Sequence, residues 1–160
     1  MVQLARPVPH RPSLLLAGAI AVIAIAAIPL GALLAQDARA PFTVTETGRG
    51  YNRLQQAVDA IGGGEGTIAI APGRYPDCAV QTAGAIAYLA VQPGTAVFDG
   101  RTCEDKAALV LRGRSAKVAG LVFQNMRVPD FNGAGIRLEQ GNLTVAESWF
   151  RDSQQGILTA

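Results

Sequence analysis

A long, uncharged apolar run lies close to the N-terminus. Residues 14–35 read LLLAGAIAVIAIAAIPLGALLA, with no charged side chain and a single proline. A run of about 20 apolar residues can cross a bilayer as a helix, whereas the apolar part of a cleaved secretory signal has about 7–15 residues. Arg6, His10 and Arg11 precede the run, so the positive-inside rule places the N-terminus in the cytoplasm. The pattern predicts a signal anchor or transmembrane helix at about 14–35, with residues 41–160 exported.

Cleavage after Ala40 is the alternative. Ala38-Arg39-Ala40 has the small-x-small form of a signal-peptidase site, but Pro41 would follow the cut, and its tertiary amide is a poor bond to cleave. Residues 1–40 are thus predicted to be a cytoplasmic tail plus anchor, and residues 41–160 a separate domain. This domain is expected to be membrane-anchored on the periplasmic or extracellular side, or secreted if the signal is cleaved.

Within the exported part, one segment has helical periodicity and the rest has the pattern of short strands. Residues 52–61 place apolar side chains on one helical stripe, at Leu54, Ala57, Val58 and Ile61. Asn52 is the expected N-cap, and Gly62-Gly63-Gly64 is expected to end the helix. Short apolar runs between turn residues predict strands at 67–71, 86–91, 95–98, 107–111, 117–123, 135–138, 142–145, 148–150 and 156–159.

The spacing of these strands predicts a repeat. Three strands end in a phenylalanine, at Phe98, Phe123 and Phe150. The separations Leu109 to Phe123 and Ile136 to Phe150 are both 14 residues, and Ile136 to Ile157 is 21. A period in the low twenties, with two or three strands in each period, is typical of a solenoid whose turns stack about 4.8 Å apart. The phenylalanines would form an interior ladder, with Asn125 and Asp152 in the adjoining turn. The alternative, a β-sandwich, needs tight hairpins, for which Asp99-Gly100 is the one candidate.

The two cysteines fit an exported domain. Cys78 and Cys103 are 25 residues apart, and a pair one turn apart lies within disulfide reach. Two unrelated buried thiols are the alternative.

The segment GTIAIAPGRY (66–75), after the predicted helix, resembles the entry into right-handed parallel β-helix proteins of the pectate-lyase-like superfamily. There a helix caps the N-terminal end, and a strand ending in Pro-Gly-x-Tyr opens the first turn. AVFDG, GLVFQNM and GAGIRLEQGNLTVAESWFRDS are similar to its repeats, so the resemblance covers about residues 42–160. It implies an all-β, right-handed parallel β-helix solenoid of four to five turns with an N-terminal capping helix. The family includes lyases, hydrolases, epimerases and adhesins, but the Asn-Thr-Asp, Asp-Asp, His-Gly and Trp-x-Asp-His patterns of its uronate-cleaving enzymes are absent.

Charge and composition exclude several functions. Only 16% of the residues are charged, and the net charge of +2 comes from residues 1–40, so the exported domain is neutral and no nucleic-acid partner is expected. The single histidine, His10, lies outside the domain, which excludes Ser-His-Asp and Cys-His catalysis there. Asp99, Glu104 and Asp105 form the densest acidic cluster, but Arg101 and Lys106 favour a solvated turn over a calcium site, so no metal or cofactor is expected.

One loop breaks the repeat. Phe123 to Ile136 spans 13 residues whereas Phe150 to Ile157 spans 7, which predicts a six-residue insertion at about 127–132, expected to be the only large break. Insertions on solenoids often form the binding surface. The candidate substrate-binding residues lie in this loop or on strands near it: Arg127, Asp130, Phe131, Asn132, Arg137 and Arg151. Arg127 and Asp130 could hydrogen-bond sugar hydroxyls or a uronate, and Phe131 offers a flat ring for a sugar. Arg137 and Arg151 could neutralise a carboxylate. A solvated loop with scattered charges remains the alternative.

These observations predict a polysaccharide-binding face, with no catalytic group evident. The alternatives are a lyase, hydrolase or epimerase acting on an acidic polysaccharide, and a structural or adhesin-like envelope solenoid. The sequence stops inside the strand at 156–159 without a polar cap, so a truncated family member or a protein partner over the last turn is expected.

Overall fold

A computed structural model describes residues 40–159 of the chain. The predicted membrane segment at 14–35 lies outside the described residues, and so do Ala38 and Arg39 of the predicted cleavage site. Within residues 40–159, no helix is long and apolar enough to cross a membrane.

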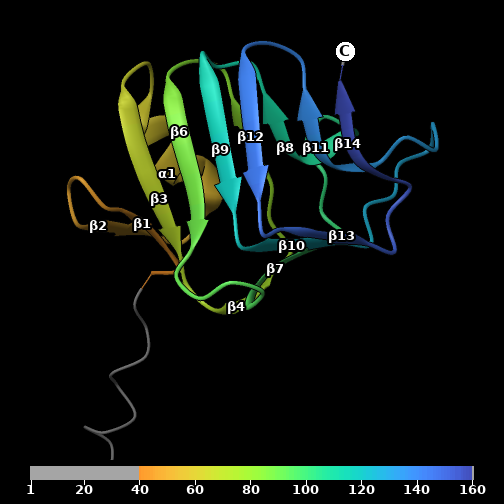
Figure 1. Ribbon diagram of the computed structural model, residues 1–160, viewed down its shortest axis with the longest axis horizontal. Coiled ribbons are helices and arrows are strands. Elements are labelled where there is room, and N and C mark those ends of the chain that lie inside the picture. The colour runs from red at the N-terminus through yellow and green to blue at the C-terminus, as the bar shows by residue number, and fades with distance from the viewer. Residues whose placement is uncertain (1–39, 160) are drawn as a thin grey trace, which may run out of the picture. The chain divides into compact units, whose positions relative to one another are not determined.

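Three sheets of mainly parallel strands make up this region (Figure 1). Sheet A contains β3 (Glu65–Ile70), β6 (Ala85–Ala90), β9 (Ser115–Ala119) and β12 (Asn142–Ala146), with the antiparallel hairpin β1 (Phe42–Val44) and β2 (Arg49–Tyr51) at its β3 edge. Sheet B contains β4 (Gly73–Tyr75), β7 (Ala96–Asp99), β10 (Leu121–Gln124) and β13 (Trp149–Arg151). Sheet C contains β5 (Ala79–Gln81), β8 (Ala107–Leu111), β11 (Ala134–Leu138) and β14 (Gln155–Thr159).

The chain visits sheets A, B and C in turn, and it does so four times between β3 and β14. Each strand pairs in parallel with the strand one circuit later, as β6 does with β9. This order is compatible with the expected solenoid. The sandwich alternative is wrong for the described region, because hairpin neighbours would pair antiparallel, and the two antiparallel strand pairs there, β1 with β2 and β1 with β3, both include β1.

The predicted phenylalanine ladder runs through the interior. Phe98, Phe123 and Phe150 are register partners on neighbouring strands of sheet B. The first two ring centroids lie 5.5 Å apart and the last two 5.2 Å, and both pairs are stacked. A Cβ on Gly135 would come within 2.6 Å of the Phe150 ring, so glycine at this position leaves room for the ladder.

Left-handed backbone positions define the turns between strands. Gly100, Asn125 and Asp152 follow three register-matched strand ends of sheet B, and all three have positive φ angles. Asparagine and aspartate tolerate this conformation better than most residues, so the predicted turn role of Asn125 and Asp152 is confirmed. Gly120, with φ of 73°, separates β9 from β10, so the single strand predicted at 117–123 is wrong.

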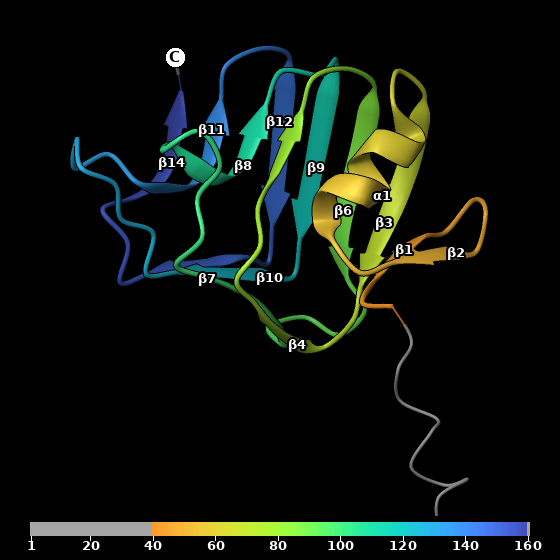
Figure 2. The ribbon, with the colours of Figure 1, turned by 180° about the vertical axis from the view of Figure 1, so that it is seen from behind.

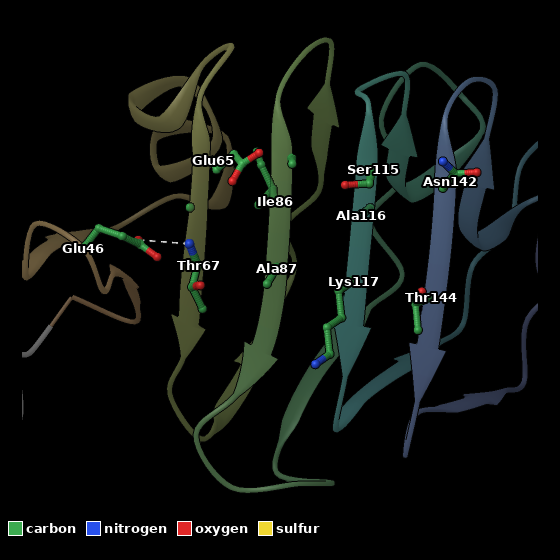
Figure 3. A pocket seen from close by; sticks show the side chains of 12 residues that line it. Glu46, Glu65, Thr67, Ile86, Ala87, Ser115, Ala116, Lys117, Asn142 and Thr144 are labelled. Atoms are coloured by element: carbon green, nitrogen blue, oxygen red, sulfur yellow. Dashed lines mark hydrogen bonds between the residues drawn. The ribbon is translucent and has the colours of Figure 1, made fainter.

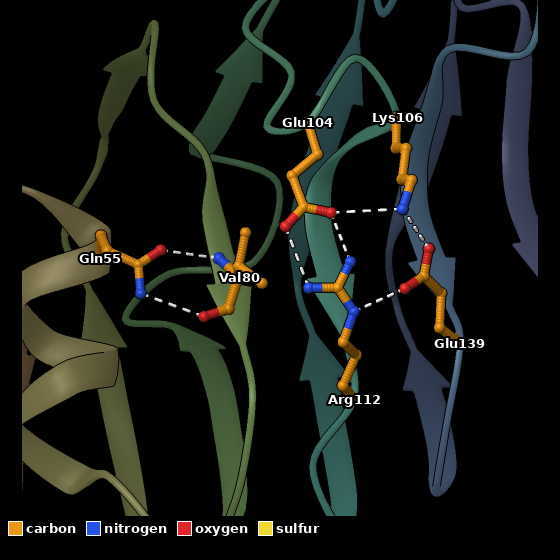
Figure 4. Close-up of polar contacts among 6 residues, drawn as sticks. All are labelled: Gln55, Val80, Glu104, Lys106, Arg112 and Glu139. Carbon is orange, nitrogen blue, oxygen red and sulfur yellow. Dashed lines mark hydrogen bonds and ion pairs between the residues drawn. The ribbon is translucent and has the colours of Figure 1, made fainter.

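The helix α1 (Leu54–Ile61) ends at Gly62 as predicted, but its predicted N-cap is wrong. Arg53 occupies the N-cap position without a capping side-chain bond. The carboxylate of Asp77 instead accepts a hydrogen bond from the Leu54 N–H at 2.9 Å. The side-chain amide of Gln55 forms two hydrogen bonds with the backbone of Val80, at 2.7 and 3.0 Å, so α1 covers the free edge of β5 (Figure 4).

Candidate ligand-binding face

The connections from sheet B to sheet C differ strongly in length. The first and last, residues 76–78 and 152–154, have three residues each, whereas the middle two span 100–106 and 125–133. The predicted insertion in the second of these loops is confirmed. The expectation that it is the only large break is wrong, because the 100–106 loop is also extended and precedes it by one circuit.

The 100–106 loop is fixed covalently and by ion pairs. Cys103 forms the predicted disulfide with Cys78, with Cα atoms 5.6 Å apart. Arg112 and Lys106 bridge the carboxylates of Glu104 and Glu139 (Figure 4). Hydrogen bonds from Arg112 and then Lys106 lower the pKa of Glu104 to about 2, and those from Lys106 and then Arg112 lower that of Glu139. These contacts hold the loop in place, and its Cys103 packs against Ala107, Val110 and Ala134 of sheet C.

The acidic cluster considered for calcium is not assembled as a metal site. The carboxylate of Asp99 binds Arg74, Gln124 and Asn125, the last at 2.7 Å. Glu104 is occupied by Arg112 and Lys106. In the part of the chain that the structure describes, no three histidine, cysteine or acidic side chains gather to hold a metal.

The 125–133 loop is held closed by one side chain from the next circuit. Gln154 Oε1 accepts hydrogen bonds from the N–H groups of Val128 and Gly133, at 2.9 and 2.7 Å, and its Nε2 donates to the Val128 carbonyl at 3.1 Å. Phe131 lies at a positive φ of 58° and is 80% exposed. The loop lies beside β11 and β14 (Figure 2). Its backbone is held by Gln154, and the Phe131 ring is exposed on it.

Polar side chains form a row across the outer face of sheet B. One member comes from each strand, in the order Arg74, Asp99, Gln124 and Arg151. Gln124 donates from Nε2 to Asp99 at 3.1 Å and accepts from Arg151 Nε at 3.0 Å. The row orients the Arg151 guanidinium and leaves its two Nη groups without a protein acceptor among residues 40–159.

Trp149 shares this outer face with Arg151, because side chains two residues apart on a strand point the same way. The intervening Phe150 belongs to the interior ladder. Trp149 is 49% exposed, and an added Cβ on Gly94 would lie 3.5 Å from its ring, so the indole packs against that turn. Trp149 is not among the binding residues predicted from the sequence. The alternation Trp149-Phe150-Arg151 was the signal that could have identified it.

All three candidate arginines lack acidic partners within the part of the chain that the structure describes. Four arginines of the domain form ion pairs: Arg53, Arg74, Arg112 and Arg114. Within residues 40–159, Arg127, Arg137 and Arg151 form none. Arg127 Nη2 donates only a long bond of 3.4 Å to the carbonyl of Asp152, which directly follows Arg151. The structure thus brings Arg127 and Arg151 to one corner of the molecule.

The remaining candidates are more scattered. Asp130 is exposed and Asn132 half-buried at the end of the same loop. Arg137 lies on β11, level with Val110 and Leu158 in sheet C, and its Nε is buried without a hydrogen-bond partner. Among the described residues, no hydrogen bond or ion pair joins Arg137 to the other candidates. We define the basic-aromatic face as Trp149, Arg151, Arg127 and Phe131.

The side chains of this face are of types that can contact flat rings and anions. Aromatic rings offer flat apolar surfaces, and a guanidinium can bind a carboxylate through two parallel hydrogen bonds.

Comparisons with protein-family models, curated proteins and solved structures found no match for the chain.

Proposed function

We propose that the protein is an exported, membrane-anchored, right-handed parallel β-helix domain that binds an acidic polysaccharide through the basic-aromatic face. The pectate-lyase-like resemblance supports the handedness and the helical cap, and the apolar run at 14–35 supports the anchor. The observation that carries the binding function is the pair Trp149 and Arg151 on one face of β13, with the guanidinium oriented by Gln124 and free of acidic partners.

The arrangement suits an acidic sugar polymer. Outward side chains two residues apart on a strand are separated by about 6.8 Å, so one sugar can stack on Trp149 while its carboxylate, or that of the next sugar, reaches Arg151. Arg127, which contacts the carbonyl of Asp152 just after β13, and Phe131 in the same loop would contact further sugars. A long polymer would therefore meet two aromatic and two cationic groups.

The test is direct binding of the full-length protein to an oligogalacturonate and to its fully methyl-esterified form, which has the same rings without the charges. We expect the free acid to bind more tightly, with an affinity that falls as salt is added, because exposed charges are screened. Equal binding of the two ligands, or binding of neither, would contradict the proposal.

A polysaccharide lyase is a second candidate, favoured by one observation. Arg137 Nε is buried and has no hydrogen-bond partner, and a desolvated cationic group beside a sugar could assist proton removal. Prolonged incubation with the same oligogalacturonate, followed by mass spectrometry, distinguishes the two functions. Shorter, unsaturated products would support the lyase, and an unchanged ligand that still binds would support a binding domain.

A further inference from the structure

A second polar surface lies on the outer face of sheet A, apart from the basic-aromatic face. A hollow of about 570 Å³ crosses β3, β6, β9 and β12 and reaches the turn between β1 and β2 (Figure 3). Its floor is lined by the small side chains Ala85 and Ala87. Seven polar side chains stand around this floor: Glu46, Glu65, Thr67, Ser115, Lys117, Asn142 and Thr144.

Strand register orders these side chains in rows. Thr67, Ala87, Lys117 and Thr144 are register partners on four adjacent strands. Because neighbouring strands lie about 4.8 Å apart, Thr67 and Lys117 are separated by about 10 Å, with only the Ala87 methyl group between them. Ser115 and Asn142 form a parallel row with Ala85. Between Thr67 and Lys117, a slender chain can therefore cross β6 without meeting a large side chain.

Two opposite charges, Glu46 and Lys117, face this hollow without an ion-pair partner among the described residues. Glu46 accepts a hydrogen bond from the Thr67 N–H at 3.0 Å, and this bond lowers the pKa of Glu46, which keeps it charged at neutral pH. Lys117 is exposed. Neither forms an ion pair within residues 40–159, whereas Glu65 at the same hollow is paired with Arg114 at 3.1 Å. The hollow thus has an anionic end beside β3 and a cationic group two strands away.

We propose that this hollow binds a short, extended peptide with a free ammonium group and a free carboxylate. The ammonium would lie against Glu46 and the carboxylate against Lys117. An extended chain covers about 3.3–3.6 Å per residue, so about three residues span the gap. Hydroxyl and amide groups of Thr67, Ser115 and Asn142 offer donors and acceptors to the peptide backbone. Among the described residues that line the hollow none is aromatic, which favours a peptide over a stacked sugar.

The test uses the ¹⁵N-labelled full-length protein and trialanine with free termini. Titration is expected to shift the backbone amide signals of Ala87 and Lys117, and trialanine blocked at both ends should bind more weakly. Lys117→Gln and Glu46→Gln should each weaken trialanine binding about two- to fivefold, as expected for exposed charge pairs. Arg101→Gln, an exposed charge in the 100–106 loop, is the matched control and should bind like the unaltered protein.

Three results would overturn the proposal: no shifts with millimolar trialanine, equal binding of free and blocked peptide, or displacement of trialanine by an oligogalacturonate. The last result would assign the hollow to saccharide. Failure of oligogalacturonate binding at the basic-aromatic face leaves this test unaffected, because the two surfaces lie on different sheets.

Discussion

The carboxylate of Asp77 accepts a hydrogen bond from the backbone N–H of Leu54, 23 residues earlier, at 2.9 Å. Its other oxygen accepts bonds from Arg53 and from the N–H of Cys78. One buried side chain in the turn between β4 and β5 thereby caps α1, ties down that turn and fixes the residue that enters the disulfide. The helix is attached to the first circuit of the sheets through this group.

Replacement of Asp77 should therefore lower the free energy of unfolding. Asp77→Ala removes a helix cap, worth about 1 kcal/mol, and leaves buried N–H groups without an acceptor, at about 1–3 kcal/mol. We expect the free energy of unfolding, measured by urea denaturation, to fall by about 2 kcal/mol or more. Asp59→Ala on the exposed side of the same helix is the control, with an expected change within about 0.5 kcal/mol. Similar losses in both variants would contradict the capping role.

The disulfide gives a second prediction. Denaturing alkylation without reductant should label neither Cys78 nor Cys103, and prior reduction should expose both. By the loop-closure estimate, removing a bridge that closes a loop of this length costs about 3–4 kcal/mol, so a Cys78→Ala, Cys103→Ala variant should lose about that much stability in the same denaturation assay. Full labelling of both cysteines before reduction would refute the bridge.

Strand spacing was sufficient to predict the repeat, because equal separations between strands of successive circuits bring equivalent residues into register. The register partners Leu109 and Ile136, and Phe123 and Phe150, agree with the equal 14-residue separations in the sequence. The strands at 73–75 and 79–81 were missed because each has only three residues and carries little periodicity. The N-cap was predicted wrongly because its acceptor, Asp77, comes from a distant turn rather than from the local sequence.

The candidate site was only partly predictable. Loop length identified the 125–133 loop, since an insertion changes the spacing whatever its conformation. Which arginines lack partners could not be predicted, because pairs such as Arg74 with Asp99 join residues 25 positions apart. The exposure of Trp149 likewise depends on the direction in which β13 faces, which is fixed by the packing of Phe150 in the interior ladder.

The ion-pair network over sheet C predicts a specific pH dependence. The folded-state pKa of Glu104 is lowered from 4.5 to about 2 by its hydrogen bonds to Arg112 and Lys106. A lowered folded-state pKa contributes stability that is present above pH 4.5 and is lost as the pH falls toward 2. The free energy of unfolding should therefore decrease more steeply over this range in the unaltered protein than in Glu104→Gln. If the pH profiles of the unaltered protein and Glu104→Gln run parallel, Glu104 adds nothing to stability through its ion pairs.

The most direct test of the proposed function is the effect of Arg151→Gln and Trp149→Ala on binding of oligogalacturonate and its methyl ester to the full-length protein. Arg151→Gln should weaken the free acid about tenfold, the value of a charge-assisted hydrogen bond, reduce its salt dependence and leave the ester unchanged. Trp149→Ala should weaken both ligands about equally, because stacking depends on the ring. Arg49→Gln on β2, far along the chain from this face, should change neither. If Arg151→Gln and Arg49→Gln bind the free acid with the same affinity as the unaltered protein, the basic-aromatic face is not the binding site.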